Sequence, residues 1–271
     1  MKDQTKQPPA PYYGGKGRLA SRIVKLIPDH DLYNEPFIGG GYVFWAKPSS
    51  SIEVINDVNG LVINFYKVLK DKFKALQKLI DNTLYSFQEH QHACLMYKNP
   101  ELFTDVQLAW AYWVCCCQGF ASKICSGWGY EKKGDNKTVK SFHNRKARLL
   151  DSEYYTKRLE SVYIECRDAL KVIQNRDVER AFHYIDPPYP GTSQGHYGKF
   201  GFDKRRFVEL LELLLDIKGK FILSSYPYPE LTQFVNQNGW HQVSFKQTIS
   251  VNKSGKQKTE VLTANFLIAL N

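Results

Sequence analysis

The residues best suited to chemistry are Asp186-Pro187-Pro188-Tyr189, which follow an apolar stretch at 181–185. That stretch predicts a buried strand, and the two prolines end it because proline has no N–H to donate to a sheet. In open α/β sheets ligands bind outside the carboxyl ends of strands, so Asp186 is expected to face a crevice. A carboxylate, a rigidly held carbonyl and a flat ring together suit an exocyclic amino group on a planar base. The structural alternative is a strand followed by a turn with a capping aspartate.

Two glycine-bearing stretches come earlier in the chain. Tyr12-Tyr13-Gly14-Gly15-Lys16 precedes a segment with the apolar spacing of a helix, and glycines at such a point let backbone amides and a lysine approach a ligand. Glu35-Pro36-Phe37-Ile38-Gly39-Gly40-Gly41 predicts the end of a strand, a turn and the start of a helix. Neither stretch contains the phosphate-loop pattern or a good dinucleotide fingerprint.

Asp57 ends the second predicted strand, residues 51–57. An acid at this position accepts hydrogen bonds from ribose hydroxyls in nucleotide-binding folds. The glycine turn and this acid together predict a cofactor that contains a nucleoside but no pyrophosphate. A glycine-rich loop and a helix-capping aspartate would be the alternative reading.

The positive charge of the chain is concentrated in one segment. Residues 121–148 hold eight Lys or Arg and two acidic residues, a net +6 of the +10 carried by the whole chain. Basic residues interleaved with aromatic ones predict contact with a nucleic acid, whereas a solvated basic loop is the alternative. The predicted contacts are Lys123, Trp128, Tyr130, Lys132, Lys133, Lys137, Lys140, Arg145 and, in a C-terminal loop, Lys253, Lys256 and Lys258.

Other classes of protein are disfavoured by composition. The six cysteines contain no C-x-x-C pair, and three of them are consecutive (Cys115, Cys116 and Cys117), so neither a disulfide framework nor a metal site is expected. No apolar run approaches the roughly 20 residues needed to span a bilayer. The N-terminus has no apolar signal region, and residues 1–10 predict a loose tail.

Predicted strands alternate with helices along most of the chain, and the C-terminus predicts a hairpin. This pattern indicates an α/β sheet that is mostly parallel with one antiparallel strand. A helical, basic block at 72–160 interrupts the alternation and predicts an inserted module. The expected division is therefore 1–71 for the cofactor, 72–160 for target recognition, and 161–271 for the remaining catalytic part.

The three motifs occur in an order that resembles the Dam-like (D12 class, α-group) DNA adenine-N6 methyltransferases. They are Tyr12-x-Gly14-Gly15-Lys16, then Glu35-Pro36-Phe37-x-Gly39-x-Gly41, then Asp186-Pro187-Pro188-Tyr189. The C-terminal segments 248–250 and 260–262 also resemble the last hairpin of that family, so the resemblance covers nearly the whole chain. It implies a Rossmann-like methyltransferase sheet with an inserted helical target-recognition domain.

The resemblance also implies a cofactor, a target and roles for residues. S-adenosylmethionine is expected to contact Tyr12, Gly14, Gly15, Lys16, Glu35, Phe37, Gly39, Gly41, Asp57, Asp168 and Asp186. Asp186, Pro187, Pro188 and Tyr189 are expected to hold an adenine flipped out of duplex DNA. Transfer of the methyl group to N6 is expected to be direct, without a covalent enzyme intermediate.

The expected partner is double-stranded DNA, with no metal and no membrane, for a monomer or weak dimer in the cytoplasm of a prokaryotic cell or phage-infected host. An RNA adenine methyltransferase and a catalytically silent nucleic-acid-binding module are the alternatives, and N4 methylation of cytosine usually goes with serine in place of Asp186. Residues 126–133 depart from the recognition stretch of enzymes that act on GATC, so the target site stays open. A solitary or a restriction–modification role stays open as well.

Overall fold

The computed structural model describes residues 7–149, 152–191, 201–248 and 257–268. The chain forms two compact units. Unit 1 comprises Met1–Ser21, Gly39–Ser49 and Asn59–Cys166, and unit 2 comprises Arg22–Ile38, Ser50–Val58 and Arg167–Asn271. Neither unit is continuous in sequence.

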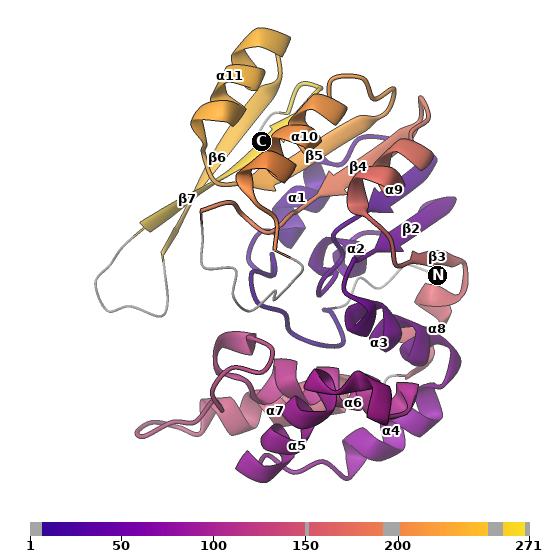
Figure 1. Ribbon diagram of the computed structural model, residues 1–271, viewed down its shortest axis with the longest axis vertical. Helices are drawn as coiled ribbons and strands as arrows, with labels where there is room; N and C mark the ends of the chain where they lie inside the picture. Colours follow the sequence, from indigo (N-terminus) through magenta and orange to yellow (C-terminus); the bar gives the residue numbers. More distant parts are fainter. Residues whose placement is uncertain (1–6, 150–151, 192–200, 249–256, 269–271) are drawn as a thin grey trace. The chain divides into compact units, whose positions relative to one another are not determined.

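A seven-stranded sheet has the order β3-β2-β1-β4-β5-β7-β6 (Figure 1). Its strands are β1 (Leu32–Glu35), β2 (Ile52–Asn56), β3 (Val162–Glu165), β4 (Ala181–Ile185), β5 (Lys220–Ser225), β6 (His241–Thr248) and β7 (Gln257–Ala264). β1 pairs in parallel with β2 and β4, and β4 with β5, whereas β7 is antiparallel to both β5 and β6. The predicted α/β fold, with its terminal hairpin and one antiparallel strand, is confirmed.

The central strands of unit 2 are buried on both faces. Every residue of β1 and of β4 is buried, as expected for parallel strands covered by helices on both sides. The helices of this unit are most of α1 (Ala20–Leu26), with α9 (Ala169–Asn175), α10 (Lys204–Leu213) and α11 (Pro229–Asn238).

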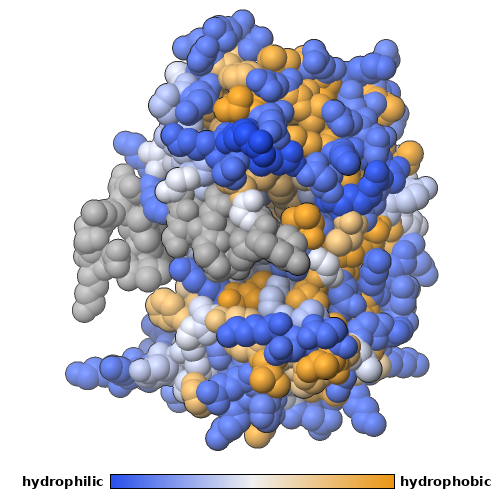
Figure 2. Space-filling model, in the orientation of Figure 1, coloured by the Kyte–Doolittle hydropathy of each residue, from blue (hydrophilic) through white to orange (hydrophobic). Residues whose placement is uncertain are grey.

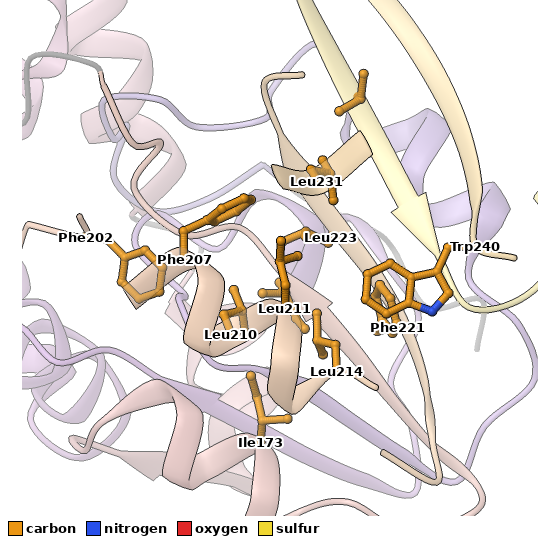
Figure 3. Close-up of a cluster of buried hydrophobic side chains, with 12 residues drawn as sticks. Ile173, Phe202, Phe207, Leu210, Leu211, Leu214, Phe221, Leu223, Leu231 and Trp240 are labelled. Atoms are coloured by element: carbon orange, nitrogen blue, oxygen red, sulfur yellow. The ribbon is translucent and has the colours of Figure 1, made fainter. Parts of the chain in front are cut away.

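The packing of α10 shows how these helices are held on the sheet. Asp203 caps the helix by accepting a hydrogen bond of 2.8 Å from the N–H of Arg206. Leu210 and Leu211 of α10 then pack in one cluster with Phe221 of β5 (Figure 3). Burial of these apolar side chains fixes the sheet whose strand ends carry the candidate site.

Unit 1 is largely helical. Its helices are α2 (Tyr42–Ala46), α3 (Gly60–Asp71), α4 (Phe73–Asp81), α5 (Phe87–Lys98), α6 (Asp105–Gln118), α7 (Lys137–Leu149) and α8 (Ser152–Glu160), with short 3-10 turns at Pro100–Leu102 and Phe120–Ser122. α6 begins with a capping box formed by Thr104 and Gln107, and it is buried from Leu108 to Gln118. α3, α4, α5 and α7 pack around this buried helix.

The boundaries of unit 1 differ from those expected from the sequence. The predicted insertion at 72–160 lies within this unit, but α3 and the segments at 7–21 and 39–49 belong to it too. The physical reason is that α3 packs on α6 and α8, so its apolar face is buried among the insertion's helices. Target recognition by 72–160 stays a prediction.

The predicted loose tail is wrong for residues 8–10. Pro8, Pro9 and Ala10 are buried. The indole N–H of Trp113 donates a hydrogen bond of 3.1 Å to the carbonyl of Pro9, and the Tyr155 hydroxyl donates one of 3.0 Å to the carbonyl of Gln7. Backbone carbonyls thus attach this segment to α6 and α8. Among the described residues, no helix is both long and apolar enough to cross a membrane.

Candidate active site and nucleic-acid surface

Asp186 directly follows β4, which lies between β1 and β5 in the sheet. Its side chain is partly exposed, and its Oδ1 accepts a hydrogen bond of 3.2 Å from the Tyr189 hydroxyl. Pro187 is buried and Pro188 partly buried between them. The sequence prediction of a strand that ends on this aspartate is confirmed, and the turn brings the aromatic residue back onto the carboxylate.

Two residues that the sequence analysis missed complete this network. Ser224 of β5 lies 2.8 Å from the Tyr189 hydroxyl and donates a hydrogen bond of 3.0 Å to Oε1 of Glu260 on β7. The same carboxylate oxygen accepts a hydrogen bond from Tyr189. Ser224 and Glu260 are both buried. Because β4, β5 and β7 are neighbours in the sheet but far apart in sequence, only strand order brings these side chains together.

The Tyr189 hydroxyl is a donor in this network. Burial, followed by the nearby carboxylates of Asp186 and Glu260, raises the pKa of Tyr189 well above its ordinary value. The phenol therefore keeps its proton at neutral pH. Its ring is held edge-to-face against Tyr226 at 4.6 Å between centroids.

Polar groups at the ends of β1 and β2 are fixed by a second network in unit 2. Glu35 is buried at the end of β1 and accepts a hydrogen bond of 2.5 Å from Tyr33. Asn56, at the end of β2, donates to the carbonyls of Pro36 at 2.9 Å and Arg167 at 3.0 Å, and it accepts from the N–H of Arg167 at 2.9 Å. The sequence analysis missed Asn56.

Asp57 follows Asn56 and is partly exposed, so its carboxylate is placed at the carboxyl edge of the sheet. A carboxylate that accepts hydrogen bonds from ribose hydroxyls is expected at this edge of the sheet.

Phe37, two residues after Glu35, packs edge-to-face on Phe202, with 5.4 Å between the ring centroids.

Asp168 has a structural function that its predicted cofactor role did not include. Its Oδ1 caps α9 by accepting hydrogen bonds from the N–H groups of Leu170 at 3.1 Å and Lys171 at 3.3 Å. Its Oδ2 forms an ion pair with Arg206 of α10. The contact between Asp168 and the cofactor stays a prediction.

In unit 1 the first motif and the glycine turn contact each other. The ring of Tyr12 covers Gly39 and Gly40, where an added Cβ would lie 2.9 Å from Cε1 and 2.7 Å from Cβ of that tyrosine, respectively. The ring of Tyr42 covers Gly15. The backbone at Gly39 has φ +44°, a left-handed conformation that disfavours other residues. The glycines of the two motifs thus form a cradle of backbone atoms, and the side chains of Tyr12 and Tyr42 pack directly against it.

The remaining motif residues line the same part of unit 1. Gly14 and Gly15 are exposed, Gly14 has φ +76°, and Gly41 adopts φ +66° where α2 begins. Lys16 is 7% exposed and donates a hydrogen bond of 3.2 Å to the carbonyl of Gly14. Exposed glycine backbone beside a buried cation suits a ligand that carries a carboxylate, as the sequence predicts.

Substituting Gly15 with alanine tests this cradle. The added Cβ would lie 2.0 Å from Cε2 of Tyr42, so the ring or the turn must shift. We expect Gly15→Ala to lower the free energy of unfolding by about 1–3 kcal/mol, which is the usual cost of overpacking. Gly127→Ala is the matched control, since no atom lies within 4 Å of its added Cβ. Thermal unfolding measures the stability of both variants. Equal stability of the two would contradict the packing of Tyr42 on Gly15.

The basic segment forms a cationic pocket on α7. The pocket has a volume of about 340 Å³ and is lined by Gln7, Pro8, Pro11, Tyr42, Lys137, Lys140, Ser141, Asn144, Arg145 and Arg148. Arg145 is held by donating a hydrogen bond of 3.3 Å to the carbonyl of Cys117, and Arg148 by one of 3.4 Å to that of Pro8. Backbone carbonyls therefore hold Arg145 and Arg148, two of the four cationic side chains that line the pocket. Cations held in this way suit a bound anion.

The loop before α7 extends from the helices of unit 1 as a hydrophilic arm (Figures 1 and 2). Lys132 and Lys133 are exposed on it, and Lys137 is exposed at the first position of α7. Lys137 lies 3.9 Å from Asp135 in a solvated ion pair. Such exposed cations can reach phosphates without a large desolvation cost.

The two aromatic residues predicted to contact nucleic acid differ in burial. Trp128 is partly buried against Tyr85, at 5.5 Å between centroids, and against Phe87. Tyr130 is 60% exposed and stacks on Trp128 at 5.8 Å. Trp128 therefore supports the loop, and Tyr130 presents the more accessible ring.

Of four further predicted contacts, two belong to the described part of the chain. The Lys123 ammonium lies over the ring of Tyr13 at 4.7 Å. Lys258 lies 3.2 Å from the Tyr226 hydroxyl, which places it next to the ring that supports Tyr189. Lys253 and Lys256 lie outside the described residues.

Comparisons with known proteins agree with these features. The family model described as D12 class N6 adenine-specific DNA methyltransferase matches residues 12–249. Over 275 residues the sequence is 25% identical to a Type II methyltransferase, M1.LlaDCHI, of Lactococcus lactis subsp. cremoris, and the match covers 93% of each chain. Over 240 residues it is 28% identical to the DNA N-6-adenine-methyltransferase of Escherichia phage P1, covering 84% of this chain and 31% of that longer protein.

Among solved structures, a precorrin 8w decarboxylase from Methanobacterium thermoautotrophicum matches with a TM-score of 0.39 at 9% identity, over 92% of this chain and 90% of that one. A likeness that low carries no weight for function. The family match spans both glycine motifs, the whole basic segment at 121–148, and Asp186 with its turn. The chain belongs to the D12 class of N6 adenine-specific DNA methyltransferases.

Proposed function

We propose that this protein transfers a methyl group from S-adenosylmethionine to N6 of an adenine flipped out of duplex DNA. The observation that carries the proposal is the arrangement at the carboxyl end of β4. There Asp186 is followed by two prolines, and its carboxylate accepts a hydrogen bond from Tyr189. The alternative is a merely capping aspartate, a role that does not require the hydrogen bond that Asp186 accepts from the Tyr189 hydroxyl.

The amino group of adenine needs two hydrogen-bond acceptors to become a nucleophile, because its lone pair is conjugated with the ring. Asp186 and the carbonyl of Pro187 supply them. Hydrogen bonds from N6–H to these oxygens favour a tetrahedral nitrogen and stabilise the positive charge that develops during attack. The ring of Tyr189 provides a stacking face for the base.

The hydrogen bonds around Tyr189 have a positioning role. Its single hydroxyl proton is shared between Asp186 and Glu260, so the phenol oxygen bridges the two carboxylates and restricts the movement of Asp186. Because the phenol keeps its proton, this bridge does not change across the neutral pH range. Preorganised acceptors of this kind need little rearrangement during the reaction.

The residues of the cofactor motifs fit S-adenosylmethionine. When bound, this cofactor supplies an electrophilic methyl group on a sulfonium. In unit 1 the exposed backbone of Gly14 and Gly15, with Lys16, would hold its carboxylate end, and Tyr12 with the Gly39 and Gly41 turn would lie along it. Asp57, in unit 2, stays the predicted acceptor for the ribose hydroxyls, and Glu35, Phe37 and Asp168 stay predicted contacts of the cofactor.

A methyl-transfer assay tests the proposed function. The protein is incubated with radiolabelled S-adenosylmethionine and either duplex DNA or RNA, and the labelled nucleosides are identified after digestion. We expect label in N6-methyladenine from duplex DNA alone. Label in RNA alone, or in N4-methylcytosine, would overturn the proposal.

We also propose that the arm before α7 contacts phosphates. Lys132 and Lys133 of the arm and Lys137 at the start of α7 are exposed, and Lys137 also lines the cationic pocket. Replacing these three with alanine should weaken binding to DNA and reduce the slope of log K against log salt by about 0.9 for each phosphate that the variant no longer neutralises. Fluorescence anisotropy across a series of salt concentrations measures that slope.

A triple variant at Lys67, Lys74 and Lys78 is the matched control. These lysines are exposed on α3 and α4 of the same unit, and their replacement removes the same charge. We expect the control to keep the original slope. The same slope for both variants would show that the arm is only a solvated loop.

A further inference from the structure

Three cysteines of unit 1 place their sulfur atoms together, and a histidine lies next to one of them. The Sγ of Cys94 lies 3.7 Å from Nε2 of His90 and 3.8 Å from Sγ of Cys115, which lies 3.9 Å from Sγ of Cys125. The three sulfur atoms are all within 4.8 Å of one another. These residues come from α5, from α6 and from the loop after the 3-10 turn at Phe120–Ser122.

The spacing of these atoms is that of ligands around one small cation. Zinc binds thiolate sulfur at about 2.3 Å and imidazole nitrogen at about 2.0–2.1 Å, so in a tetrahedral site the ligand atoms lie roughly 3.5–3.8 Å apart. The sulfur atoms of a disulfide would lie about 2.05 Å apart. The distances of 3.7 Å from Cys94 to His90, 3.8 Å from Cys94 to Cys115 and 3.9 Å from Cys115 to Cys125 are close to the first value and far from the second. His90 Nε2 is not within 4.8 Å of all three sulfur atoms, so its ring must shift toward them to complete a tetrahedral set.

The local structure orients all four side chains inward. His90 and Cys94 are four residues apart on α5, so they share one face of that helix. His90 is 4% exposed and Cys115 is fully buried. Cys125 has φ +51°, a left-handed conformation that costs energy in a residue with a side chain, and it turns the loop toward the two helices.

We propose that Cys94, Cys115, Cys125 and His90 bind one zinc ion. Three thiolates and a neutral imidazole form a closed tetrahedral set, which is typical of structural rather than catalytic zinc. The sequence prediction of no metal relied on the absence of C-x-x-C pairs. The ligands instead come from three separate elements, and the neighbouring Cys116 and Cys117 are not part of the set.

The position of the ion indicates which part of the structure it would stabilise. It would attach the loop at 120–126 to α5 and α6, and this loop leads to Trp128 and the basic arm. The chain that follows this loop is also attached to α6 by the hydrogen bond of 2.8 Å from the N–H of Gly129 to the carbonyl of Gln118. Zinc would thus order the base of the DNA-contact arm, a consequence that rests on the proposed function.

Metal analysis of the intact protein tests the site. The chain is expressed in zinc-supplemented medium, purified without an affinity tag that binds metal, and measured by mass spectrometry for metals. We expect about one zinc per chain, and less than about a tenth of that in Cys94→Ser and Cys125→Ser. Cys166→Ser is the matched control, because Cys166 is exposed and lies outside the cluster, and it should keep its zinc.

Two further measurements test the zinc site even if the cysteine variants fail to fold. A strong chelator should lower the Tm of the wild-type protein, and added zinc should restore it. Substitution with Co²⁺ should give thiolate charge-transfer and tetrahedral ligand-field absorption, and the ligand-field bands should shift in His90→Gln.

Several outcomes would overturn the proposal. They are wild-type protein that contains no zinc and binds none on addition, intact mass showing a disulfide within the cluster, or a cobalt spectrum that His90→Gln leaves unchanged. Metal content and Tm are read without any methyl-transfer assay. Failure of the zinc site and failure of the proposed function are therefore distinguishable.

Discussion

Replacing Asp186 with alanine is expected to abolish methyl transfer while binding of DNA is largely retained. The substitution removes the carboxylate that accepts from N6 of adenine, and it also removes the partner of the Tyr189 hydroxyl. Loss of one preorganised electrostatic group typically costs about 10²–10³-fold in kcat, and Asp186 is a charged group at the reacting nitrogen. The rate is measured under single turnover with labelled cofactor, and binding by anisotropy.

Two comparisons make this result specific to the active site. Asp216→Ala removes an exposed aspartate elsewhere in unit 2 and should leave the rate unchanged. Asp186→Asn keeps an acceptor oxygen but loses the charge, so its rate should lie between those of the wild type and Asp186→Ala. Retained turnover in Asp186→Ala would refute the proposed role of the carboxylate.

Tyr189 is expected to contribute separately through its ring and its hydroxyl. Tyr189→Ala removes the stacking face and should cost about 1–3 kcal/mol, or roughly 5- to 150-fold in kcat/KM. Tyr189→Phe keeps the ring and removes the hydrogen bonds of the hydroxyl to Asp186, Glu260 and Ser224. We expect a smaller loss of about 5-fold, since a net hydrogen bond contributes about 1 kcal/mol.

Glu260→Gln provides a test of the same hydrogen bond from its other end. Its amide keeps the size of the side chain but replaces a charged acceptor of the Tyr189 hydroxyl. It should therefore reduce the rate to about the same extent as Tyr189→Phe, and combining the two changes should cost less than the sum. If Tyr189→Phe were as slow as Tyr189→Ala, the stacking role of the ring would be wrong.

The sequence predicted most of the fold because its signals are local. Prolines after 181–185 end a strand, glycines at 39–41 permit a left-handed turn, and Asp203 caps a helix; each effect acts within a few residues. Alternation of strands and helices outside the inserted block then indicates a sheet that is mostly parallel. The boundaries of the two units were harder to predict from the sequence, because α3 joins the inserted helices through packing between distant segments.

For the candidate site, the sequence by itself determined which chemical groups are present and at which strand end Asp186 lies. Only the tertiary structure decided which groups meet: Glu260 with Tyr189, Tyr42 with Gly15, and Cys125 with Cys94 and Cys115. Strand order and helix packing set those contacts, and they arise from burial summed over whole elements. A motif records what the backbone does over a few residues, whereas the partners of a side chain depend on how segments far apart in the chain are packed.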